Sequence, residues 1–175
     1  MGTKETIFEE EIVSRADPPP AYKGSVGKTR MESVLWTSPS GEIISVRVHT
    51  SVNATTDPAL AERLCAGTLN WIRSPADDEL HPVMTPVVYH NEALFLFLLV
   101  LPDHFRCREL EERAALLEKI SKDKAHSVPR YVYDFGVVFG HEELAALFSL
   151  RQKPKVENTP VRPPPARYLA REEAY

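Results

Sequence analysis

The densest group of residues able to do chemistry is a five-residue stretch that holds Asp77, Asp78, Glu79 and His81. Carboxylate oxygens are the ligands that calcium and magnesium prefer, and an imidazole can bind a metal or exchange a proton near neutral pH. Together with His90, this group supports the hypothesis of a metal-dependent hydrolase. The spacing of an EF-hand loop is absent, which favours the alternative that the stretch is a solvated acidic turn.

A second candidate is the segment 24–29, which ends like a phosphate-binding loop with Gly27, Lys28 and Thr29. The full motif needs another glycine five residues before Gly27 and a strand ahead of the loop. Tyr22 occupies the glycine position, and proline-rich sequence stands where the strand should be. We therefore interpret the segment as a flexible linker.

Cysteine and histidine add no further site. Cys65 and Cys107 lie far apart in helix-like patterns, and we interpret both as buried free thiols of a reducing compartment. The six histidines are dispersed, and no two have the i, i+4 spacing of neighbouring ligands on a helix. No nucleophile with an adjacent base is evident, so the residue types favour binding over catalysis.

Length and composition limit the class of protein. The 175 residues suffice for one domain, and 43% hydrophobic with 26% charged residues is typical of a globular protein. A net charge of −4 makes nucleic-acid binding an unfavoured alternative. The longest apolar run, residues 93–101, is shorter than the roughly 20 residues of a membrane helix. With no signal-peptide pattern, we expect a cytoplasmic protein without membrane insertion.

Proline marks the expected domain boundaries. Eight of the 15 prolines lie in residues 1–30 and 151–175, which contain few periodic apolar residues. We expect an extended or disordered N-terminal segment over 1–30, a folded domain over 31–150 and a Pro-rich C-terminal tail over 151–175.

Within the domain, apolar periodicity predicts an α+β fold with a largely antiparallel sheet and two or three helices. We expect strands at 33–36, 42–52, 69–73, 83–90, 94–101 and 131–139, and helices at 58–66, 104–122 and 142–150. Asp57 before Pro58 has the pattern of a helix N-cap, and Pro86 indicates an edge strand that could pair with a second copy. In the second helix we expect four residues to face inward, namely Leu110, Leu116, Leu117 and Ile120.

Four stretches, residues 50–58, 66–70, 86–91 and 137–144, resemble the bacterial and archaeal CpXC domain, and the resemblance covers about residues 34–150. That family is named for two Cys-Pro-x-Cys knuckles. The resemblance implies that one knuckle lies in a hairpin before the first helix and the other in the turn after the next strand. It also implies a zinc-ribbon-like site made by the four cysteines.

In this sequence the four cysteine positions match Thr37, Ser40, Ser74 and Asp77. Hydroxyl groups are poor zinc ligands beside thiolates, so the resemblance implies a degenerate member whose ribbon-like hairpins hold no zinc, and we expect no cofactor. Turn hydrogen bonds and packing must then replace the metal. Trp36 and Trp71, which precede the two knuckle positions, are candidates to fill that space.

The two Pro-rich ends combine proline with aromatic and basic side chains. Such segments suit the aromatic grooves of partner proteins, because the polyproline II conformation lowers the entropy lost on docking. The alternative is a solubilising spacer. The residues expected to contact a partner are Pro19, Pro20, Tyr22, Arg162, Pro163, Pro164, Pro165, Arg167 and Tyr168.

These observations support a non-catalytic protein-interaction or scaffold module of a bacterial cytoplasmic complex, which binds other proteins through its core and tails. A homo-oligomer is one alternative assembly. The other functional hypotheses are the metal-dependent hydrolase and a weak nucleic-acid binder that would depend on the basic C-terminal tail.

Overall fold

The computed structural model describes residues 24–123 and 127–152. The nine residues expected to contact a partner, from Pro19 to Tyr168, lie outside the described residues. The boundaries at residues 30 and 151 therefore stay predictions. Among the described residues, no helix has the length and apolar character needed to cross a membrane.

The α+β class is confirmed. Five strands form one sheet in the order β1-β2-β5-β6-β7. They are β1 (Arg30–Thr37), β2 (Ile43–Asn53), β5 (Val87–Asn91), β6 (Leu96–Leu101) and β7 (Gly136–Phe139). The β1–β2 and β5–β6 pairs are antiparallel, whereas β2–β5 and β6–β7 are parallel. The sheet is thus mixed, because each parallel pair is joined by a crossover that contains a helix.

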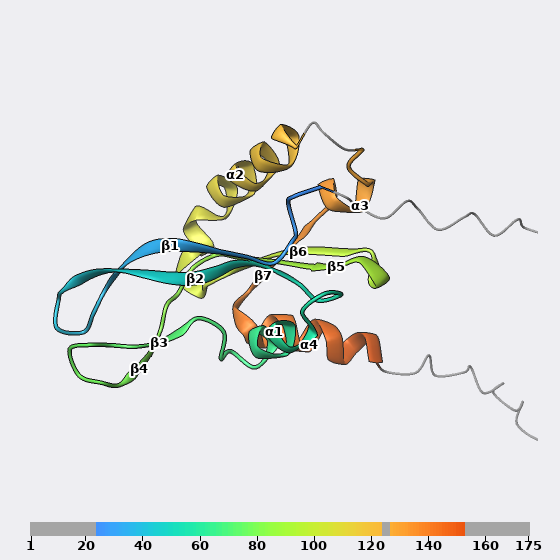
Figure 1. Cartoon of the computed structure of the whole chain (residues 1–175). Helices are drawn as coiled ribbons and strands as arrows, with labels where there is room; N and C mark the ends of the chain where they lie inside the picture. The colour runs from blue at the N-terminus through green and yellow to red at the C-terminus, as the bar shows by residue number, and fades with distance from the viewer. Residues whose placement is uncertain (1–23, 124–126, 153–175) are drawn as a thin grey trace, which may run out of the picture.

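Helices cover both faces of this sheet (Figure 1). On one face lie α2 (Glu109–Lys122) and α3 (Arg130–Tyr133), and on the other α1 (Pro58–Cys65) and α4 (Gly140–Gln152). Strand β6 is buried along its whole length and supplies both cores. Phe97, Leu99 and Leu101 pack in the core that contains residues of α2 and α3, and Leu98 and Val100 pack in the core of α1 and α4.

A two-stranded sheet of β3 (Trp71–Arg73) and β4 (Leu80–Pro82) lies beside the β1–β2 hairpin, and both hairpins project beyond the helices (Figure 1). Asn70 fastens them together. Its side-chain oxygen accepts the His49 N–H at 2.7 Å, and its amide nitrogen donates to the His49 carbonyl at 2.8 Å. These two bonds fix the small sheet against the edge of β2.

Two expected strands differ in the structure. Residues 131–139 were expected to be one strand, but they contain the end of α3 and then β7. An apolar run cannot distinguish a buried helix turn from a strand, and here the carbonyl of the N-cap residue Pro129 accepts the Val132 N–H at 3.0 Å. Strand β5 is central rather than an edge, because Pro86 lies just before it and removes no ladder hydrogen bond. The strand β4 was not expected.

The second expected helix begins differently. Residues Asp103–Arg108 form a 3-10 helix, and the α-helix starts at Glu109. The buried residues of α2 are Leu116 and Ile120, whereas Leu110 is 81% exposed and Leu117 is also exposed. The expectation that Leu110 and Leu117 face inward was therefore wrong. Leu110 and Leu117 are seven residues apart and share one face of α2, whereas Leu116 and Ile120, four residues apart, form the face that packs on the core.

Candidate functional site at the paired hairpins

The turn between β1 and β2 is held by Ser38. Its carbonyl accepts the Gly41 N–H at 2.8 Å, and its own N–H donates to the Glu42 carbonyl at 2.8 Å. The buried Ser38 hydroxyl accepts the Glu42 N–H at 3.1 Å and lies 2.7 Å from the Ser40 hydroxyl. Gly41 has φ +86°, a conformation that favours glycine. The turn is therefore closed by its own polar groups.

The turn between β3 and β4 has the same design around Ser74. The Ser74 N–H donates to the Glu79 carbonyl at 2.8 Å, and the Ser74 carbonyl accepts the Asp78 N–H at 2.9 Å. The buried Ser74 hydroxyl accepts the Ala76 N–H at 3.2 Å. In both turns a buried serine hydroxyl thus accepts a backbone N–H.

The prolines relate the two turns to the Cys-Pro-x-Cys pattern. Aligned on Pro39 and Pro75, the pattern places its first cysteine at the two buried serines, Ser38 and Ser74. Thr37 and Ser40, which were expected to occupy cysteine positions, are exposed. The proline next to Ser38 is the sequence signal that identifies this residue.

A zinc ion does not fit these turns. The aligned positions offer two hydroxyls, already used as hydrogen-bond acceptors, together with Asp77 and the side-chain-free Gly41. Structural zinc sites use four thiolate or imidazole ligands. The donor set of the two turns therefore disagrees with the metal that the resemblance implies.

Next to the second turn, the ligand atoms of Asp77, Glu79 and His81 lie within 4.8 Å of one another. The His81 Nε2 is 2.8 Å from one carboxylate oxygen of Asp77, and the other accepts the Glu79 N–H at 3.1 Å. The Glu79 amide, followed by His81 and Ser74, lowers the pKa of Asp77. The three side chains could hold a cation. Their contacts with one another and with the Glu79 N–H also stabilise the turn without a metal.

One tryptophan lies between the hairpins. The ring centroids of Trp36 and His81 are 5.9 Å apart, so Trp36 joins the first hairpin to β4. Trp71 is exposed, and its ring N–H donates to the Gly67 carbonyl at 2.8 Å. Trp36 alone therefore takes the expected place between the two turns.

His90 is separate from this group. It lies on β5, 1% exposed, with Nδ1 at 3.3 Å from the Gly27 carbonyl and Nε2 at 2.9 Å from the Tyr131 hydroxyl. Burial lowers its pKa. The structure brings His81 to Asp77 and Glu79, but it places His90 among residues of another region, so the hydrolase hypothesis loses one of its groups.

The stretch 50–58, which resembles the family, forms the turn before α1. Asn53 accepts the Thr56 N–H at 3.3 Å and donates to the Glu92 carboxylate at 3.2 Å. The Asp57 carboxylate accepts the hydroxyls of Thr29 and Thr56 at 2.5 and 2.7 Å, and these bonds lower its pKa. Asp57 is the N-cap residue as expected, but its side chain caps no helix N–H. The polar side chains of this stretch therefore stabilise the fold through hydrogen bonds.

The two cysteines and the glycine-containing segment show no chemical activation. Cys65 is half-buried, and burial raises the pKa of its thiol. Cys107 is exposed, which corrects the expectation of a buried thiol, because it lies on the 3-10 helix before α2. Segment 24–29 runs into strand β1 rather than a helix, so the geometry of a phosphate-binding loop is not present there.

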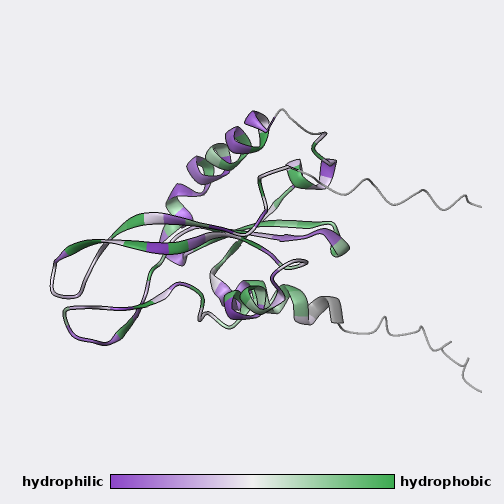
Figure 2. Ribbon diagram, viewed as in Figure 1, coloured by the Kyte–Doolittle hydropathy of each residue, from purple (hydrophilic) through white to green (hydrophobic). Residues whose placement is uncertain are grey.

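Apolar side chains remain exposed on the outer faces of both hairpins. On β1 and β2, Leu35 is 78% and Ile43 is 66% exposed, and the strand register places them on one face as diagonal neighbours. On the small sheet, Trp71 and Leu80 are exposed. Figure 2 shows apolar residues on these projecting strands. Since Trp36 alternates with Leu35, the Leu35 face points away from the contact with His81.

The comparisons with known proteins agree with the resemblance. A family model described as CpXC protein matches residues 39–151, which include the second turn, the stretch 50–58 and all strands from β2 to β7. No curated protein and no solved structure matches the chain. The family match covers more than half of the sequence, and the chain therefore belongs to the CpXC protein family.

Proposed function

We propose that this chain is a non-catalytic interaction module that binds protein partners through the outer face of the β1–β2 hairpin. The observation that carries the proposal is the exposure of Leu35 and Ile43 on a hairpin that projects from the core. Apolar residues gathered on a projecting strand face are typical of interaction surfaces.

Strand β1 also supports this proposal. It stands at the end of the strand order, so among the described residues one of its edges has no neighbouring strand. An edge strand can accept an extended peptide through backbone hydrogen bonds, while side-chain contacts give specificity. The proposed partner therefore contributes an extended segment with an apolar side chain that packs on Leu35.

The buried polar side chains form structural hydrogen bonds, and this favours binding over catalysis. Ser38 and Ser74 hold the two turns, Asn53 holds the turn before α1, and His90 joins β5 to α3. A catalytic group needs to reach a substrate, whereas these groups are occupied by the fold. The Pro-rich ends are proposed as additional contacts with partners in a bacterial cytoplasmic complex.

The test compares the partners of three full-length forms isolated from the natural host by affinity capture and quantitative mass spectrometry. The double variant Leu35→Ser with Ile43→Ser is expected to reduce specific partners by about tenfold or more. The control is Leu110→Ser, which changes an equally exposed leucine on α2. Equal amounts of the same partners in all three forms would contradict the proposal.

A second candidate function, binding of a divalent cation, is supported by the convergence of Asp77, Glu79 and His81. Calorimetric titration of the full chain with Mn²⁺ or Zn²⁺ tests it. If these residues bind the ion, His81→Gln weakens binding, while His104→Gln on the 3-10 helix has no effect. Absence of a saturable site would exclude this function.

A further inference from the structure

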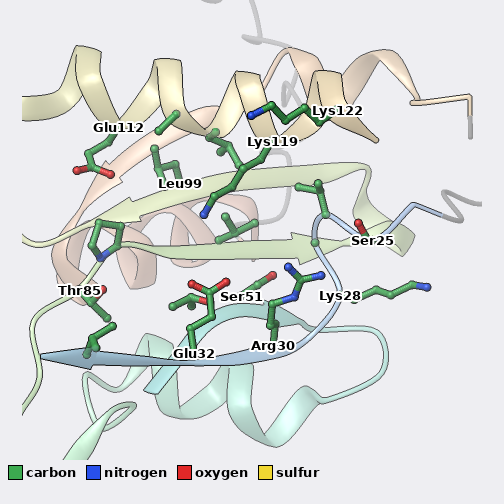
Figure 3. A pocket seen from close by; sticks show the side chains of 18 residues that line it. Ser25, Lys28, Arg30, Glu32, Ser51, Thr85, Leu99, Glu112, Lys119 and Lys122 are labelled. Carbon is green, nitrogen blue, oxygen red and sulfur yellow. The ribbon is translucent and has the colours of Figure 1, made fainter. Parts of the chain in front are cut away.

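A cavity of about 420 Å³ lies between helix α2 and strands β1, β2, β5 and β6 (Figure 3). This volume falls within the range of about 300–1,000 Å³ that is typical of small-molecule sites. Apolar residues of the sheet and of α2 line it, among them Val34, Val88, Leu99 and Leu116. The cavity is therefore large and apolar enough to accommodate a short hydrocarbon body.

Ser51 gives this cavity an unsatisfied polar group. The residue is 8% exposed, and its hydroxyl oxygen is buried without a hydrogen-bond partner. It lies opposite Arg30 on β1 and opposite Val88 on β5 in the strand register. Buried hydroxyls in proteins almost always have a partner, and a group bound in the cavity would supply one.

Two cationic side chains reach the cavity from opposite sides. In Figure 3, Lys119 extends from α2 toward the strands, and Arg30 points up from β1. Neither forms an ion pair or side-chain hydrogen bond with another described residue. Arg30 and Ser51 are neighbours across β1 and β2, so a guanidinium and a free hydroxyl share one side of the cavity.

The remaining charges leave this end of the cavity cationic. Lys122 is paired with Glu118 at 2.5 Å, and Glu112 is paired with Arg108 at 3.3 Å. The carboxylate of Glu32 also lines the cavity. Among the described residues that line the cavity, Arg30 and Lys119 thus outnumber Glu32, the one lining carboxylate without an ion pair, whereas Lys28 points away from the cavity (Figure 3).

We propose that this cavity binds a small amphipathic carboxylate. Its carboxylate accepts hydrogen bonds from Arg30, Lys119 and the Ser51 hydroxyl, and its hydrocarbon body packs between Leu99 and Leu116. The fork of donors on a guanidinium matches the two oxygens of a carboxylate, and burial of the hydrocarbon supplies the apolar part of the affinity. The site is separate from the outer hairpin face proposed for protein partners.

The first experiment titrates the full chain with decanoate by isothermal calorimetry, at concentrations below micelle formation. We expect one saturable site for each chain. Acetate, which lacks the hydrocarbon body, and decanol, which lacks the charge, are each expected to bind at least about tenfold more weakly. Binding of decanol as tight as that of decanoate, or no saturable binding of decanoate, would overturn the proposal.

Variants locate the site. Arg30→Gln is expected to weaken decanoate binding by about tenfold, whereas the matched control Arg47→Gln, on the neighbouring strand outside the cavity, leaves it unchanged. Ser51→Ala removes a buried hydroxyl without a partner, so the melting temperature of the free protein stays equal or rises while the affinity falls. Affinities of Arg30→Gln and Ser51→Ala equal to that of Arg47→Gln would overturn the assignment.

Chemical acetylation of the full chain tests whether the cavity is open. The Lys119 amine is expected to react in the free protein and to be protected by decanoate, while acetate at the same concentration protects it much less. Protection of Lys119 before decanoate is added would mean that another segment of the chain or a second copy fills the cavity. That result would overturn the proposal.

Discussion

The Nε2 atom of His90 lies 2.9 Å from the Tyr131 hydroxyl, and this contact joins central strand β5 to helix α3. On the other side of the ring, Nδ1 lies 3.3 Å from the Gly27 carbonyl. A carbonyl can only accept, so Nδ1 carries the proton and Nε2 accepts from Tyr131. The Phe97 ring, 5.1 Å away, completes the surroundings. The neutral ring thus links Gly27, in the segment that precedes β1, to Tyr131 in α3.

The first prediction concerns pH. Burial lowers the pKa of His90, and the hydrogen bond with Gly27 and the charge of Glu92 act against this shift. The stability that depends on the neutral ring is complete above the unfolded pKa of about 6.5 and is lost as the pH falls toward the lower folded pKa. The melting temperature should therefore drop as the pH falls below about 6.5, and the drop should be smaller in His90→Asn. The exposed His104, changed to Gln, serves as the control, and a drop in His90→Asn as large as in the native chain would contradict this role.

The second prediction concerns Gly27. It has φ +85°, and a Cβ atom there would lie 2.7 Å from both His90 Nδ1 and a carbon of the Phe97 ring. Gly27→Ala combines backbone strain with a clash in the core, so we expect a loss of more than about 2 kcal/mol in the free energy of unfolding. Gly41 has nearly the same φ, +86°, with no atom within 4 Å of its Cβ position. Gly41→Ala should cost only the strain, about 1 kcal/mol, and equal losses in chemical denaturation would refute the clash.

The third prediction concerns the serine turns. Ser74→Ala removes the buried hydroxyl that accepts the Ala76 N–H, in a turn whose residues from 75 to 79 are exposed. We expect a loss of about 0.5–1.5 kcal/mol in the free energy of unfolding, the usual net contribution of one hydrogen bond. Thr37→Ala, at an exposed position without a side-chain hydrogen bond to the described residues, should change it by less than about 0.5 kcal/mol. Urea denaturation measures both free energies of unfolding. A loss in Thr37→Ala as large as in Ser74→Ala would contradict the prediction.

The fourth prediction concerns the phase of α2. Ile120 is fully buried, whereas Leu117, three residues earlier, is exposed. Ile120→Ala should cost about 2–5 kcal/mol because it leaves a cavity in the core. Leu117→Ala should cost less than about 1 kcal/mol. Similar losses for the two variants would mean that α2 turns a different face to the sheet.

Local sequence determined several features with a clear physical reason. The turn at Gly41 follows from the need for positive φ, and Asp57 with Pro58 marks the start of α1. The unbroken apolar run 93–101 contains the buried strand β6, because a strand covered on both faces needs no polar alternation. The proline of each knuckle also identifies Ser38 and Ser74, whereas the prediction placed the first two cysteine positions at Thr37 and Ser40.

Other features depend on contacts between distant residues. The parallel pairs β2–β5 and β6–β7 place strands side by side across helical crossovers, and periodicity gives no information about which strands pair. Likewise, no local pattern connects His90 with Gly27 and Tyr131, or Arg30 and Ser51 with Lys119. The sequence by itself determined the family, the α+β class and the loss of the thiolates. Only tertiary packing decided that His90 holds the core and that a cationic cavity lies under α2, because these depend on which side chains the folded backbone brings together.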